Sequence, residues 1–189
     1  MTKVVKKNRN IYTFILILSL IGLSSGYMYY QTQSSELQSK ITNDLNIKET
    51  LKQGVNNIPK RTKFIIKTLI YSITILPQII NIFNIFYIPF ETGFILNILN
   101  AYSLKFSIIY ITIYHIIPLI IELILIKISI MLSKRIIELL IFKDKLSIKN
   151  LKHQTKKYLI ISSILIIYEI FIYIFSTNIN GYLVTFIPR

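Results

Sequence analysis

The sequence contains no cysteine, so disulfides, thiol nucleophiles and cysteine-ligated zinc are all excluded. Acidic residues are also scarce, because eight Asp and Glu stand against 22 Lys and Arg. Charged residues make up 16% of the chain, whereas a soluble domain usually carries about a quarter. Paired zinc-binding histidines, a phosphate-binding loop and a Gly-x-Ser-x-Gly turn are all missing. We therefore expect no enzymatic activity, and no catalytic residue, metal or cofactor.

Apolar residues dominate the chain instead. They make up 53% of the sequence, and the mean hydropathy is +0.57. Many lie in long runs, and a helix of about 20 apolar residues crosses the hydrocarbon core of a bilayer. The predicted fold is all-α: a polytopic integral membrane protein of about five transmembrane helices, one of them short or re-entrant. The net charge of +14 does not indicate nucleic-acid binding, because the basic residues flank the apolar runs.

The apolar runs divide the chain into spans and connecting segments. The first run is long enough to cross a bilayer, although the small residues Ser24, Ser25 and Gly26 also allow a cleaved signal peptide. Pro89 interrupts the next run and leaves a third one that is too short for a comfortable crossing. The predicted segments are a basic N-terminus 1–10, a first span 11–30, an extracytoplasmic polar segment 31–63, a second span 64–88, a short third span 92–104, a fourth span 106–132, a basic cytoplasmic loop 133–157, a fifth span 158–176 and a tail 177–189.

Charge predicts the orientation of these spans. With five crossings, the N-terminus and the loop 133–157 share one side and together hold twelve Lys and Arg. The opposite side holds eight, six of them in the segment 31–63. Because cytoplasmic segments carry an excess of basic residues, we expect the N-terminus inside and the C-terminus outside.

Polar side chains recur inside the spans at steps of three and seven residues, which keeps them on one helix face. We expect these faces to look into the bundle, as interhelical hydrogen bonds or as a polar cavity or proton path. Pro118 predicts a kink in the fourth span. His115 and Glu169 lie at similar depth, which predicts a buried contact between them, with Glu122 as the competing partner. The candidate intramembrane polar residues are Gln78, Asn81, Asn97, Asn100, His115, Glu122 and Glu169.

The order of these parts resembles the stage II sporulation protein M family. The features that carry the resemblance are the apolar run 11–26, a long span beginning near Lys63-Phe64, a short span opening with Glu91-Thr92-Gly93-Phe94, and His115 three residues before Pro118. The resemblance covers roughly residues 8–175. Members are often rich in Gly and other small residues in the middle spans, whereas this chain has one Gly there, Gly93, and fills the other places with Ile and Asn, so we expect its helices to pack less closely.

The resemblance implies a bacterial cell membrane protein without enzymatic activity, an accessory or scaffold that acts through partner proteins. It implies two settings. One is engulfment during sporulation, with cell-wall hydrolases as partners. The other is bacteriocin maturation, secretion or immunity, beside an ABC transporter. A transporter or permease subunit that uses the buried His and Glu residues is the alternative, and the residues leave open whether the chain forms a homo-oligomer.

Overall fold

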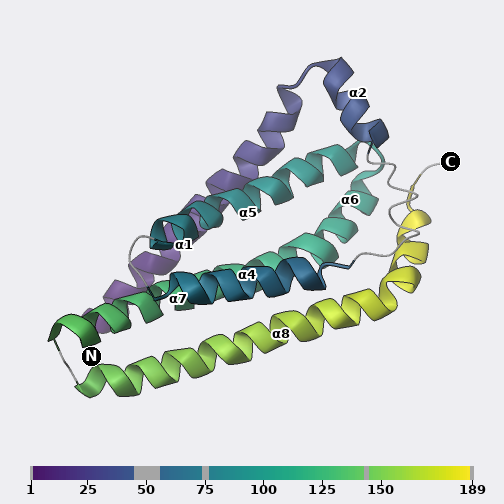
Figure 1. Cartoon of the computed structure of the whole chain (residues 1–189). Helices are drawn as coiled ribbons and strands as arrows, with labels where there is room; N and C mark the ends of the chain where they lie inside the picture. The colour runs from purple at the N-terminus through teal and green to yellow at the C-terminus, as the bar shows by residue number, and fades with distance from the viewer. Residues whose placement is uncertain (1, 45–55, 74–76, 143–144, 188–189) are drawn as a thin grey trace.

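The computed structural model describes residues 2–44, 56–73, 77–142 and 145–187 of the 189-residue chain. Within these ranges all regular structure is helical, as the apolar patterning predicts (Figure 1). The elements are α1 (Thr2–Gln31), α2 (Ser35–Asp44), α4 (Ile58–Tyr71), α5 (Pro77–Asn100), α6 (Leu104–Ile111), the π-helical turn η1 (Thr112–Ile116), α7 (Ile117–Phe142) and α8 (Lys145–Val184).

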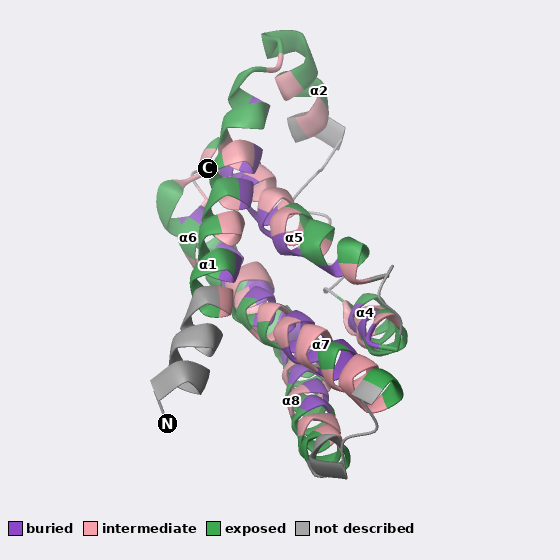
Figure 2. Cartoon of the chain, turned by 90° about the vertical axis from the view of Figure 1, so that its left-hand side faces the viewer, coloured by how far each residue is buried: buried purple, intermediate pink, exposed green. Residues whose placement is uncertain are grey.

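Within the described ranges, four stretches of helix are long and apolar enough to cross a membrane. They are Ile11–Gln31, Gln78–Asn100, Leu104–Ile141 and Asn150–Val184. Large apolar side chains cover the outward faces of these helices, for example Leu16, Phe83 and Ile174. Buried residues form stripes on the inward faces of α5, α7 and α8 (Figure 2). An apolar exterior around a more polar interior suits a lipid environment, so the chain is a multi-pass, all-α membrane protein.

The predicted boundaries of the second and third spans differ from those of the helices. The chain does not break at Pro89, because α5 runs through this residue without interruption from Pro77 to Asn100. Helix α4 ends well before this proline, at Tyr71, and α5 begins at Pro77. Amide hydrogens in the first turn of a helix have no partner within the helix, so a proline, which has none, is tolerated there. Pro77 begins α5, and Pro59 lies in the first turn of α4. Both prolines therefore lie at the start of a helix.

The prediction of about five spans compares with the four stretches named above and the short helix α4, which is not among those long and apolar enough to cross a membrane. Helices α1 and α5 run parallel, because Gly22 faces Phe86 and Gly26 faces Phe90. The chain must return between them, and α4 runs antiparallel to α5 (Figure 1). Its 14 residues span about 21 Å, less than the hydrocarbon core. The short element of the bundle is therefore α4, and the segment 92–104 belongs mostly to α5.

Helix α1 packs on α5 through glycine. A Cβ atom built on Gly22 or Gly26 would meet the carbonyl oxygen of Phe86 or Phe90, and one on Gly93 would meet that of Leu23. Gly22 and Gly26 form a Gly-x-x-x-Gly pair, a spacing that lets two membrane helices approach closely. The expectation of looser packing is therefore wrong for this pair of helices. That expectation was based on the middle spans and did not include Gly22 and Gly26 of the first span.

The segment 133–157 is mostly a helical hairpin. Helix α7 continues to Phe142, and α8 begins at Lys145. The predicted fifth span, 158–176, lies inside α8, which also takes in the tail as far as Val184. The first residues of α1, the end of α7 and the beginning of α8 lie at one end of the bundle, whereas the end of α8 lies at the other (Figure 1).

Candidate functional site

A buried ion cluster joins α4, α7 and α8. The guanidinium of Arg61 donates from Nε to Oε1 of Glu169 at 3.0 Å and from Nη1 to Oε1 of Glu122 at 2.5 Å. The three residues are only 6%, 3% and 2% exposed, in the order Arg61, Glu169, Glu122. One arginine from the short helix thus connects the two carboxylates of the long helices.

The seven-residue periodicity of the helices places these charges on inward faces. Two turns of helix return a side chain to nearly the same face. Arg61 and Thr68 are both buried on α4, whereas Lys60, Lys63 and Lys67 are exposed on its other side. The same spacing relates Glu122 to the buried Ser129 on α7, and Glu169 to the buried Ser162 and Ser176 on α8.

The charges of the cluster do not balance, because two carboxylates share one guanidinium. Arginine suits this position, since its planar fork can donate to two acceptors while it stays charged. Oε2 of Glu122 is buried and has no hydrogen-bond partner among the described residues. The nearby pair of Lys60 and Glu91, 2.9 Å apart, lies at the surface and adds no buried charge. The described cluster therefore holds one positive charge fewer than its carboxylates could pair with.

A second polar network lies two turns farther along α4. The hydroxyls of Thr68 and Tyr158 are 2.5 Å apart, and the Tyr158 hydroxyl lies 2.6 Å from the carbonyl oxygen of Ile65. Ser129 donates to the carbonyl oxygen of Thr68 at 2.7 Å and accepts from Nδ2 of Asn81 at 3.0 Å. Side chains of α5, α7 and α8 therefore meet around the C-terminal half of α4, so this helix is anchored at both ends.

The predicted contact between His115 and Glu169 is wrong. The carboxylate of Glu169 accepts from Arg61, and His115 lies partly buried in η1, with its ring centroid 6.0 Å from that of Tyr110. The competing residue, Glu122, shares the guanidinium and is not a hydrogen-bond partner of His115. The depth argument compared only α7 with α8 and overlooked the cation that α4 supplies.

Pro118 shapes the chain around His115. The predicted kink takes the form of the π-helical turn η1, in which the amide of Ile117 donates to the carbonyl of Thr112. In this pattern the carbonyl of Ile113 would be paired with residue 118, which is a proline without an amide hydrogen. The hydroxyl of Tyr168 donates to that carbonyl at 2.7 Å. A side chain of α8 thus satisfies the backbone group that the proline leaves free.

The remaining predicted polar residues lie on α5. Gln78 donates to the carbonyl of Tyr71 at 2.7 Å and closes the connection between α4 and α5. Asn97 donates to the carbonyl of Tyr27 at 2.6 Å and ties α5 to α1. Asn100 has a buried Oδ1 without a partner among the described residues. These contacts are mostly hydrogen bonds between helices. That is one of the two roles predicted for these residues from the sequence, the other being a polar cavity or proton path.

Arg61 is the site residue that the sequence reasoning missed. It stands in a basic group with Lys60, Lys63 and Lys67, and the whole group was interpreted as flanking charge. The seven-residue step from Arg61 to Thr68 could have indicated that Arg61 lies on the inward face of its helix, unlike the neighbouring lysines. The two acidic residues in the following spans also indicated that a cation from another helix must pair with them.

The fold and the cluster together define a polytopic helical membrane protein whose core is held by a buried Arg–Glu–Glu cluster. Comparisons of the chain with protein-family models, with curated proteins and with solved structures found no match. Within the described ranges no three His, Asp or Glu side chains are grouped as a metal site would need.

Proposed function

We propose that this chain is a non-enzymatic scaffold or accessory protein of the membrane that acts through partner proteins. The observation that carries the proposal is the bridging position of Arg61. Its guanidinium is buried between Glu122 and Glu169 and joins three helices. Opposite charges that pair with one another inside the bundle hold helices together and so serve helix assembly. An assembled bundle with apolar outer faces can then present those faces to other membrane proteins.

The order of the spans supports a more specific proposal. It resembles the stage II sporulation protein M family, which points to a bacterial cell membrane. The partners would be cell-wall hydrolases of an engulfment-type complex, or an ABC transporter in bacteriocin maturation, secretion or immunity.

A transporter or permease subunit is the second candidate. Oε2 of Glu122, which has no hydrogen-bond partner in the described part of the chain, favours it, together with the excess of one carboxylate in the cluster. A proton or small cation could bind there, as in membrane proteins that carry ions through buried acidic residues. His115 does not extend this site, because both carboxylates form their described ion pairs with Arg61 and none with His115.

Two measurements on the full chain separate these candidates. A photo-crosslinking residue at Leu16 or Ile174, on apolar outer faces, is expected to capture a wall hydrolase or an ABC transporter component in native membranes. The purified chain in liposomes is expected to give no proton or cation flux. Flux through the chain alone that Glu122→Gln abolishes, with no such partner captured, would instead establish the transporter candidate.

The orientation is a further prediction, with the N-terminus in the cytoplasm. Single cysteines at the exposed positions His153 and Thr185 lie near opposite ends of α8, separated by about 48 Å of helix at 1.5 Å per residue. The natural chain has no cysteine, so each variant carries one thiol. An impermeant thiol reagent on intact cells is expected to label position 185 and not position 153. The opposite pattern would place the basic hairpin outside.

A further inference from the structure

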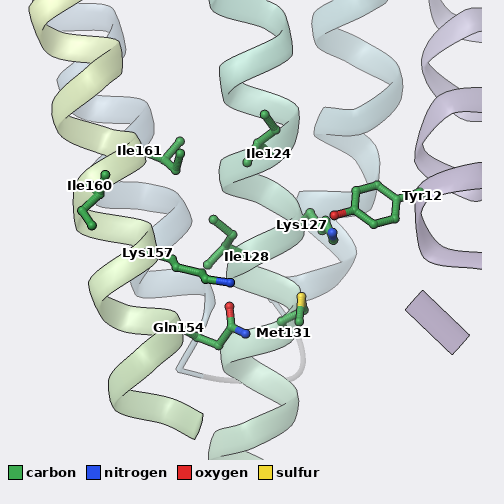
Figure 3. A pocket seen from close by; sticks show the side chains of 9 residues that line it. All are labelled: Tyr12, Ile124, Lys127, Ile128, Met131, Gln154, Lys157, Ile160 and Ile161. Carbon is green, nitrogen blue, oxygen red and sulfur yellow. The ribbon is translucent and has the colours of Figure 1, made fainter. Parts of the chain in front are cut away.

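A pocket opens between α1, α7 and α8 near the end of the bundle where α1 begins. Its volume is about 540 Å³, and its polar lining consists of Tyr12, Lys127, Gln154 and Lys157 (Figure 3). Lys157 and Gln154 extend from α8 toward α7, and Tyr12 extends from α1 toward Lys127. None of the lining residues is acidic. Two lysines therefore face one pocket whose lining, among the described residues, holds no carboxylate to neutralise them.

The first lysine is held in place by an aromatic ring. Nζ of Lys127 lies 3.0 Å from the ring centroid of Tyr12, a cation–π contact between α7 and α1. This contact leaves the three N–H donors of the ammonium without an oxygen acceptor among the described residues. Lys157 is exposed at the start of the apolar part of α8. Both ammonium groups are thus positioned for an anion at the edge of the membrane.

An apolar groove continues from this pocket toward the middle of the bilayer. It has a volume of about 390 Å³ and shares Tyr12, Ile124 and Lys127 with the pocket. From there it follows α1 and α7 as far as Leu20 and Ile120. A basic pocket that leads into an apolar groove matches a ligand with an anionic head and an apolar chain.

We propose that the pocket and the groove together bind one anionic phospholipid. Its phosphate lies between Lys127 and Lys157, and one acyl chain lies in the groove along α1 and α7. Basic pockets between transmembrane helices bind anionic headgroups in this way. The groove belongs to apolar spans, so lipid chains are the molecules that surround it. The site is separate from the ion cluster and does not depend on the proposed function.

Binding of defined lipids to the full chain in mild detergent tests the proposal. Native mass spectrometry is expected to show one phosphatidylglycerol bound more tightly than phosphatidylcholine with the same acyl chains. Replacing both Lys127 and Lys157 by alanine is expected to weaken phosphatidylglycerol binding about 30-fold. Each lysine near the headgroup is expected to contribute about 5- to 6-fold in affinity, and the two factors multiply. The matched control replaces Lys152 and Lys156, two exposed lysines of the same helix that do not line the pocket, and should change binding little.

Three outcomes would each overturn the proposal. Equal binding of the two lipids would show that the lysines do not select the headgroup. An equal loss in the control variant would assign binding to general surface charge. Binding of chain-free glycerophosphoglycerol or inorganic phosphate as tightly as the lipid would identify a free anion as the ligand. The comparisons among ligands use the unaltered chain, so they hold even if a variant does not fold.

Discussion

Replacing Arg61 by alanine is expected to lower the free energy of unfolding by about 3–5 kcal/mol, because two buried carboxylates lose their shared cation. Both carboxylates are almost fully buried, so water cannot replace the guanidinium without opening the bundle. Thermal unfolding of the purified chain in detergent measures the loss.

Lys60 provides the matched control on the same helix. It pairs with Glu91 at 2.9 Å, but its side chain is 60% exposed, so Lys60→Ala should cost at most about 1 kcal/mol. Arg61→Lys is expected to be intermediate, because an ammonium is a compact charge and lacks the planar fork that reaches both carboxylates. Equal losses for Lys60→Ala and Arg61→Ala would show that the cluster does not hold the helices together.

Neutralising the acids separates charge from packing. Arg61→Met removes the charge but keeps an unbranched side chain. If its loss of unfolding free energy comes from the unpaired carboxylates, then combining it with Glu122→Gln and Glu169→Gln should recover most of the stability. Replacement of a whole buried ion cluster is often close to neutral, whereas loss of one member is costly. Additive losses in the triple variant would instead assign the role of Arg61 to its alkyl chain and to the shape of the site.

Composition and periodicity were enough to predict the class of fold and most of the inward faces. Glu122, Ser129 and Glu169 are polar residues in apolar runs, and the cost of exposing them to lipid directs them inward. The partners of these residues were not predictable in the same way. Depth along one helix gives no information on which neighbouring helix approaches, so His115 was assigned to a carboxylate that Arg61 binds.

The short helix α4 shows a second limit of prediction from the sequence. A hydropathy argument looks for about 20 apolar residues, and α4 has 14 residues with four basic ones among them. It is stable in the bundle because Arg61 and Thr68 meet polar groups of α7 and α8, which are distant in sequence. Proline gave a misleading signal nearby, since its effect depends on whether it begins a helix, as at Pro77, or lies inside one, as at Pro89.

Alanine at Gly26 is expected to destabilise the protein by about 1–3 kcal/mol, the usual range for overpacking a tight contact. The new Cβ would overlap the backbone carbonyl of Phe90, which cannot move aside as a flexible side chain could. Gly93→Ala should act in the same direction, because its Cβ would meet the carbonyl of Leu23 from the other helix. Thermal unfolding of the full chain in detergent measures both losses.

Gly181 provides a control in which the same substitution should have the opposite sign. It lies in α8, and a Cβ there meets nothing within 4 Å. Alanine inside a helix is more favourable than glycine by about 0.5–1 kcal/mol, so Gly181→Ala should raise the stability slightly. Helix propensity favours alanine at all three positions, and only the contact between α1 and α5 can reverse its effect. A gain in stability for Gly26→Ala as well would show that α1 and α5 do not meet through their glycines.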